Sequence, residues 1–265
     1  MAIFAMIAAN MAAHSYAEPH PFLFRLFGSF AAPTFVFLSG LMIPFNAQKK
    51  QYNFFYFLLR GVATIVVGAT LDYFCWDTIP LCTFDVLYVI GLSLPIVFLV
   101  QKLNKYLHLI LALSFFVATP FLQFYFGYSE NTFGIELHPS EPASLSIAQQ
   151  FAVYPQLTHF LRDGWFPIFP WMGVALLGGF IGRIRMTKTP TDGAKLFIRI
   201  GALLVISGII IWCIQNPNLL VREGYSELFY PPTIGYFCTY IGSILIWMGV
   251  LQKTQKYFAL QFFAV

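Results

Sequence analysis

Charged residues are scarce in this chain: its 265 residues include only 15 Lys and Arg and 11 Asp and Glu, which together make up 10% of the sequence. A soluble globular domain normally contains about 25% charged residues. Hydrophobic residues account for 58% of the chain and aromatic residues for 19%. This composition excludes a soluble globular protein and predicts a protein embedded in a membrane.

Motifs that mark several large classes of enzyme are also missing. The chain has no P-loop, no dinucleotide-binding glycine pattern, no G-x-S-x-G and no H-E-x-x-H, which excludes the ATPases, dehydrogenases, esterases and zinc proteases that carry them. Its four cysteines, at positions 75, 82, 213 and 238, lack the spacing of metal ligands, so no metal site is predicted. We expect buried free thiols; a disulfide between Cys75 and Cys82 is the alternative in an oxidising compartment.

Long apolar runs occupy most of the chain instead. Most are about 17 to 24 residues long, which at a rise of about 1.5 Å per residue matches a hydrocarbon core of about 30 Å. The sequence therefore predicts an all-α polytopic transmembrane bundle of about eight to nine membrane helices, in a single membrane domain over residues 1–265. The expected helices cover residues 1–13, 22–45, 54–74, 84–100, 107–126, 166–182, 196–214 and 234–251, and a further one begins at 257. Because the first and last runs are short, we expect the domain to be incomplete at both ends.

Basic residues gather in four short segments between the apolar runs. Ten of the 15 Lys and Arg lie there: Lys49, Lys50, Lys102, Lys105, Arg183, Arg185, Lys188, Lys195, Lys253 and Lys256. The positive-inside rule makes these segments cytoplasmic, so the N-terminus is predicted to be cytoplasmic and the histidines at positions 14, 20, 138 and 159 external. We expect an integral protein of the bacterial inner membrane with the lipid bilayer as its partner. Topology explains the basic residues, so no nucleic-acid partner is predicted.

Histidines and acids on the predicted external side are candidates for catalysis. Imidazole titrates near neutral pH and can act as a base or as an acyl carrier, although loop histidines are also found as ordinary interfacial residues. Asp72 and Asp85 stand at the ends of expected helices, and Asp85, at a helix N-terminus, is expected to act as a cap. Asp163 precedes a double-proline segment, where its carboxylate can orient an external histidine or simply be solvated.

Arg60 lies inside an apolar run, about seven residues or about 10 Å from its cytoplasmic end. A charge at that depth usually faces the interior of the helix bundle and meets a partner or an anionic ligand. The alternative is that its long side chain snorkels toward the cytoplasmic interface.

Proline and glycine residues mark bends and close contacts in the expected helices. Pro33, Pro167 and Pro170 should each leave a backbone carbonyl without its helical partner and bend the helix. Gly178 and Gly182 form a small-xxx-small pair, which lets two membrane helices approach closely.

Two passages resemble a known family. The first is AAPTFVFLSG, residues 31–40, with His20 thirteen residues before Pro33 and Asn10 earlier in the chain. The second is DGWFPIFPWMGVALLGGFIGR, residues 163–183, and a weaker third is DVLYVIGLS, residues 85–93. Together they resemble the membrane acyltransferase family of heparan-α-glucosaminide N-acetyltransferase and its bacterial relatives.

The resemblance implies an enzyme that transfers an acetyl or similar acyl group from a cytoplasmic coenzyme A thioester to an acceptor at the outer face. The expected donor is acetyl-CoA or another acyl-CoA, and the expected acceptor is a hydroxyl or amine, for example of a sugar. His20 matches the family's catalytic base or acyl carrier, and Asn10 matches its assisting asparagine. His14, Asp163 and Asp85 are candidates for supporting roles.

Arginine side chains suit the phosphates of coenzyme A, because a guanidinium group can hold two phosphate oxygens at once. The candidates for this role are Arg60, Arg183 and Arg185, all predicted to lie toward the cytoplasm. The oligomeric state is left open, with a homodimer as one candidate.

Two other functions are compatible with the sequence. A transporter or flippase for a small molecule or a lipid-linked sugar would also use proline-bent helices and a membrane-embedded Arg60. Such proteins are usually built from inverted repeats, and we find none here. An inactive structural subunit is the third interpretation.

Overall fold

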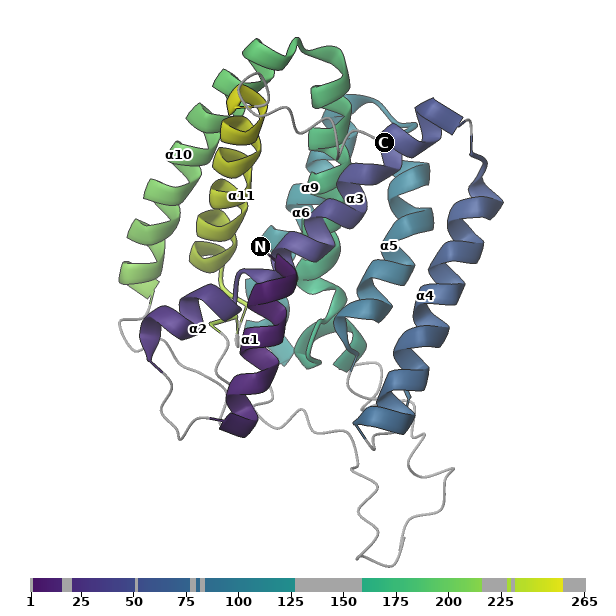
Figure 1. Ribbon diagram of the computed structural model, residues 1–265, viewed down its shortest axis with the longest axis vertical. Coiled ribbons are helices and arrows are strands. Elements are labelled where there is room, and N and C mark those ends of the chain that lie inside the picture. Colours follow the sequence, from purple (N-terminus) through teal and green to yellow (C-terminus); the bar gives the residue numbers. More distant parts are fainter. Residues whose placement is uncertain are drawn as a thin grey trace, which may run out of the picture. The chain divides into compact units, whose positions relative to one another are not determined.

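The computed structural model describes residues 2–15, 21–50, 52–76, 80–81, 84–126, 159–215, 228–229 and 232–254. Within these ranges the chain is helical and contains no strand. The elements are α1 (Ala2–Ser15), α2 (Phe22–Gly28), α3 (Ala31–Lys50), α4 (Phe54–Cys75), α5 (Val86–Val100), α6 (Lys105–Phe126), the π-helical turn η1 (His159–Asp163), α9 (Ile168–Thr187), α10 (Pro190–Gln215) and α11 (Ile234–Thr254) (Figure 1). The all-α prediction is confirmed for this part of the chain.

Among the described residues, five helical segments are long and apolar enough to cross a membrane: Phe22–Lys49, Phe54–Cys75, Lys105–Tyr125, Thr191–Ile214 and Ile234–Thr254. The apolar helix α5 has 15 residues and α1 has 14, so both are shorter than the roughly 20 residues that span a bilayer. The chain is therefore an integral membrane protein by its helices, and the expected count of eight to nine spans stays a prediction.

The chain forms two compact units. Unit 1 consists of Met1–Phe35 and Arg183–Val265, and unit 2 of Val36–Gly182. The prediction of a single membrane domain is not tested by this division.

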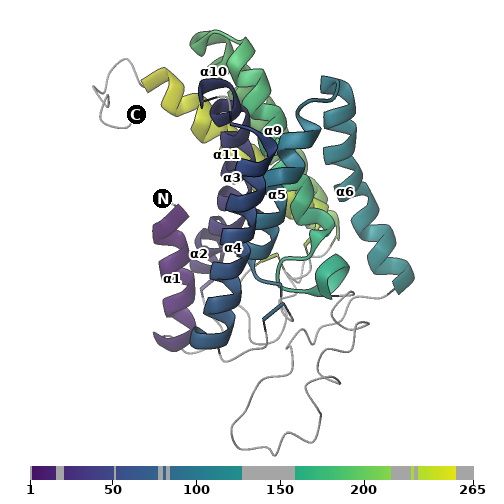
Figure 2. The same cartoon turned by 90° about the vertical axis from the view of Figure 1, so that its right-hand side faces the viewer.

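In unit 2, α4 and α5 form an antiparallel hairpin and lie side by side in both views (Figures 1 and 2). Gly61 and Gly91 face each other at its centre, where a Cβ at Gly91 would stand 2.7 Å from the Gly61 carbonyl oxygen. Near the start of α4 and the end of α5, the rings of Phe57 and Phe98 stack with their centroids 4.8 Å apart. Small residues thus bring the two backbones into contact, as is typical of membrane helices.

The predicted small-xxx-small pair lies where α9 crosses α3, again in unit 2. A Cβ at Gly178 would collide with the carbonyl oxygen of Phe37 and stand 3.0 Å from the Leu41 nitrogen. A Cβ at Gly182 would stand 2.7 Å from the Leu41 carbonyl oxygen. The prediction of a close helix contact at this glycine pair is therefore confirmed.

A fully buried histidine joins α6 to α9 within unit 2. The His108 side chain has no exposed surface, and its Nε2 lies 3.0 Å from the carbonyl oxygen of Leu176. The Phe180 ring packs edge-on against the His108 ring, with the ring centroids 5.9 Å apart.

Near the start of α9, Phe169 has non-helical backbone angles (φ −95°, ψ 115°), so the bend expected at Pro170 is confirmed.

In unit 1, α10 and α11 pack closely along their lengths as an antiparallel pair (Figure 1). A Cβ at Gly201 would stand 2.6 Å from the Gly242 carbonyl oxygen, and Gly235 meets the backbone of Trp212 near the other end of α10. This pairing agrees with the alternating helix directions expected from the sequence.

The cysteines correct one expectation. Cys75, Cys213 and Cys238 carry free thiols, as expected, but Cys75 and Cys213 are exposed rather than buried. Cys82 lies outside the described residues.

Candidate functional site

The helix expected over residues 22–45 is in fact two helices, α2 and α3, separated by a break at Ser29 and Phe30. Pro33 explains the break, because it has no N–H to donate to the carbonyl of Ser29 four residues earlier. One turn before, the Phe30 nitrogen donates to the Phe27 carbonyl at 3.1 Å instead of to that of Leu26. The carbonyls of Ser29 and Leu26 therefore both need hydrogen-bond donors from outside their own helix.

Two tyrosines of α11, in the same unit, supply these partners. The Tyr236 hydroxyl donates to the Ser29 carbonyl at 2.8 Å, and the Tyr240 hydroxyl donates to the Leu26 carbonyl at 2.7 Å. The backbone nitrogen of Leu228 completes the set by donating to the Ser29 hydroxyl at 2.7 Å. Ser29 and Tyr236 have no exposed surface, so these hydrogen bonds form away from solvent.

The predicted catalytic residues belong to the same unit as this break. Asn10 and His14 lie in α1, which contacts α2, and the structure describes their backbone alone. His20 lies outside the described residues; it directly precedes Pro21, whose carbonyl accepts the Phe24 nitrogen at 3.0 Å at the start of α2. The two helices that flank His20 in the sequence are thus neighbours in unit 1.

A polar cluster lies at one end of the α4–α5 hairpin, in unit 2. Asp72, in the last turn of α4, is fully buried and accepts a hydrogen bond from the Tyr88 hydroxyl. The same hydroxyl accepts the backbone N–H of Leu81 at 3.2 Å. Leu81 and Phe84 adopt positive φ angles of 67° and 54°, which non-glycine residues rarely do. The cluster therefore links Leu81 to the facing ends of the two helices.

Asp85 caps α5, as expected from the sequence. Its Oδ1 accepts the N–H of Val86 at 2.6 Å. Burial raises the pKa of the Asp85 carboxyl to about 6; the hydrogen bond from Val86 opposes this change, and the nearby charge of Asp72 adds to it. A carboxyl group with this pKa can hold or release a proton near neutral pH.

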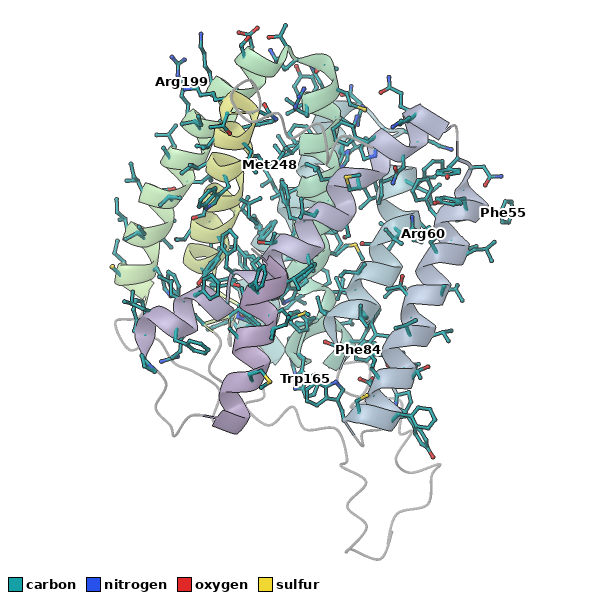
Figure 3. The ribbon with its side chains drawn as sticks, in the orientation of Figure 1. Phe55, Arg60, Phe84, Trp165, Arg199 and Met248 are labelled. Atoms are coloured by element: carbon teal, nitrogen blue, oxygen red, sulfur yellow. The ribbon has the colours of Figure 1, made fainter. Side chains whose placement is uncertain are left out.

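The segment that contains Asp163 packs against this cluster. The Phe166 nitrogen donates to the Phe84 carbonyl at 2.9 Å, and the Phe84 and Phe160 rings lie 4.7 Å apart. Figure 3 shows Phe84 and Trp165 at the same end of unit 2. Asp163 itself lies in η1, where the structure describes its backbone alone. Two predicted supporting acids, Asp85 and Asp163, thus lie on adjoining segments.

The pairing of Asp72 with Tyr88 was not predicted from the sequence. The signal was present, because an acid inside a long apolar helix usually has a polar partner in the protein. Tyr88 follows Asp85 by three residues in DVLYVIGLS, so both residues lie within one turn of the start of α5.

Arg60 does not face the interior of unit 2, so the expectation that it points into the helix bundle was wrong. The side chain lies on α4 (Figure 3) and is exposed. Its Nη1 donates to the Tyr56 hydroxyl at 3.1 Å. Its guanidinium carbon lies 5.7 Å from the centre of the Tyr56 ring, which stacks on Tyr52. Because Tyr56 lies one turn closer to the start of α4, the side chain reaches back toward that end, as the snorkelling interpretation expects.

Arg183 and Arg185 lie in the last turns of α9, where both are half-buried. Gly193, in the first turn of α10, faces this region: a Cβ there would stand 3.9 Å from Arg185 Cδ, 3.8 Å from Lys188 Cβ and 3.3 Å from Gln252 Oε1. These arginines belong to unit 1, whereas Arg60 belongs to unit 2.

In the described ranges, no group of three or more His, Cys, Asp and Glu residues could hold a metal ion. The acids of the α4–α5 cluster are instead bound by a tyrosine hydroxyl and by backbone N–H groups.

Comparison with known proteins extends the family resemblance to most of the chain. No curated protein and no solved structure matches the sequence. A family model does match, over residues 1–217, and this range includes α1 to α10 with Asn10, His20, the α4–α5 cluster and the double-proline segment. The chain therefore belongs to the family described as heparan-alpha-glucosaminide N-acetyltransferase, catalytic.

Proposed function

We propose that the protein transfers an acyl group, expected to be acetyl, from cytoplasmic acyl-coenzyme A to a hydroxyl or amine acceptor, such as a sugar, at the outer face of the membrane. The observation that carries the proposal is the family match over residues 1–217. Apolar helices of membrane-spanning length support a reaction within a bilayer. The match gives no support to the alternative of a transporter or flippase.

His20 is the proposed catalytic residue. As a base, its imidazole takes the proton of the acceptor O–H or N–H while the acceptor attacks the thioester carbonyl. The carbon–sulfur bond then breaks, and the coenzyme A thiolate leaves and takes up a proton. As an acyl carrier, the imidazole nitrogen attacks the thioester first, and the acceptor displaces it in a second step. In both routes the acyl group ends on the acceptor.

Asn10 is the proposed partner of His20, because its side-chain amide can hydrogen-bond the imidazole or the developing oxyanion. Its position on α1, which contacts α2, supports this pairing. Asp85, Asp163 and His14 are proposed to support proton transfer at the outer side. The raised pKa of Asp85 suits that role.

Coenzyme A phosphates are proposed to bind from the cytoplasmic side. Arg183 and Arg185 are half-buried at the end of α9, and Arg185 lies near the first turn of α10. Their guanidinium groups can each hold two phosphate oxygens. Arg60 is the third candidate, and its contact with Tyr56 holds the guanidinium near the start of α4. The bacterial inner membrane is the proposed location, and the positive-inside rule supports an external His20.

The reaction itself is the test of this proposal. Purified protein in liposomes receives radiolabelled acetyl-CoA on one side of the membrane and glucosamine on the other. We expect acetylated glucosamine to form only when both are present. Uptake of glucosamine without any acyl-CoA, together with no acetylated product, would instead establish the transporter function.

A further inference from the structure

The break between α2 and α3 is held by α11, which begins at Ile234 and so lies beyond the residues 1–217 that match the family. We propose that Tyr236 and Tyr240 of α11 are positioning residues for His20: their hydroxyls fix α2, and Pro21 at the start of α2 directly follows His20 in the chain. This proposal rests on the proposed function, because it takes His20 as the catalytic residue.

The two hydroxyls fit the two carbonyls that the break exposes. Tyr236 and Tyr240 are four residues apart and so lie on one face of α11, one turn apart. Ser29 and Leu26 are three residues apart, so their carbonyls are also about one turn apart along α2. The resulting bonds of 2.8 Å and 2.7 Å each replace a helical hydrogen bond that the break removes.

Packing holds the two hydroxyls in place. Tyr236 has no exposed surface and Tyr240 only 3%. Their rings lie 4.4 Å apart, and Trp212 of α10 lies 5.9 Å from the Tyr236 ring and 6.4 Å from the Tyr240 ring. Phe30, at the break, packs 5.7 Å from Tyr240. The side chains cannot turn without displacing these neighbours, so the hydroxyls are preorganised for the carbonyls.

The helix α2 depends on such outside contacts. It has seven residues, fewer than an isolated helix needs in order to be stable, and no side chain caps its N-terminus at Pro21. Ser29 and Pro21 are eight residues apart, or about 12 Å along a helix. A tilt of about 10° at the break would therefore move Pro21, to which His20 is bonded, by about 2 Å. Since a misplacement of about 1 Å can lower a rate by about 100-fold, losing one hydroxyl should be visible in kcat.

The experiment uses the full chain with Tyr236→Phe or Tyr240→Phe, which remove only a hydroxyl. Tyr73→Phe is the matched control, because the Tyr73 ring lies exposed on α4, in the other unit. Binding of coenzyme A is measured first, and kcat is calculated per binding site so that unfolded protein does not count. We expect each α11 variant to lose at least about tenfold in kcat while KM for acetyl-CoA changes less than about twofold, and the control to keep both values.

Several results would overturn the proposal. These are an unchanged kcat in both variants, an equal loss in the control, or a loss of coenzyme A binding in both variants, since the hydroxyls would then act in folding. The proposed function is tested separately by His20→Ala. If that variant is inactive and the tyrosine variants keep full kcat, only the positioning role fails; if His20→Ala is fully active, the catalytic assignment itself fails.

Discussion

Replacing Gly178 by alanine probes the closest approach of α3 and α9. The new Cβ would meet backbone atoms of α3, the Phe37 carbonyl oxygen and the Leu41 nitrogen at 3.0 Å, so no side-chain rotation can relieve the clash. Overpacking of this kind costs up to about 3 kcal/mol. Alanine recovers about 1 kcal/mol of helix propensity over glycine. We therefore expect the free energy of unfolding to fall by about 2 kcal/mol, which corresponds to a Tm lower by about 4 to 8 °C.

Gly193→Ala is the matched control, since it makes the same chemical change in a helix with more room. The nearest atom to its Cβ would be Gln252 Oε1 at 3.3 Å, at the end of a side chain that can move. We expect this variant to melt at or slightly above the temperature of the unaltered protein. Thermal unfolding of both variants in detergent, followed by tryptophan fluorescence, gives the comparison. If Gly178→Ala is as stable as Gly193→Ala, the two helices do not cross as closely as described.

Three further predictions concern pH, a buried histidine and topology. The pKa of Asp85 is about 6 in the folded protein and 3.8 ordinarily, so stability should fall by up to about 3 kcal/mol as the pH rises from about 4 to 6. Asp85→Asn should flatten this dependence in thermal unfolding; an unchanged slope would contradict the burial of the carboxyl. His108→Leu should lower the free energy of unfolding by about 1–3 kcal/mol, and His108→Gln should lower it less, because Gln can still donate to the Leu176 carbonyl. Equal losses in the two variants would argue against the hydrogen bond. In an otherwise cysteine-free chain, His20→Cys should react with an impermeant maleimide from outside cells and Lys188→Cys should not; the reverse would overturn the predicted topology.

The helix break between α2 and α3 shows what can and cannot be predicted from the sequence. Pro33 predicts a bend and a carbonyl without its helical partner, and the structure has both. The position of the break at Ser29 and the identity of its partner could not be predicted, because Tyr236 is 207 residues away in the chain. Local chemistry identifies a group that needs a partner, whereas tertiary packing decides which residue supplies it.

Arg60 and Asp72 show the same limit for the candidate site. Both are charged residues inside apolar helices. The sequence indicates how far each lies from the end of its helix but not toward which side its side chain points. Asp72 turns toward α5 and is fully buried against Tyr88, whereas Arg60 is exposed and reaches back to Tyr56. Lipid and protein interior are equally apolar, so hydrophobic neighbours in the sequence do not distinguish the two directions. The glycine pair at Gly178 was easier to interpret, because only close backbone contact requires it.

Single-turnover acyl transfer by the His20→Ala variant tests the catalytic role most directly. The measurement mixes excess protein with radiolabelled acetyl-CoA and an amine acceptor, after binding of coenzyme A has shown that the variant is folded. We predict a rate lower by about 10²- to 10⁴-fold, the usual contribution of a general acid or base, and an unchanged rate for His138→Ala as the matched histidine control. Transfer at the unaltered rate by His20→Ala would contradict the assignment of His20 as the catalytic residue.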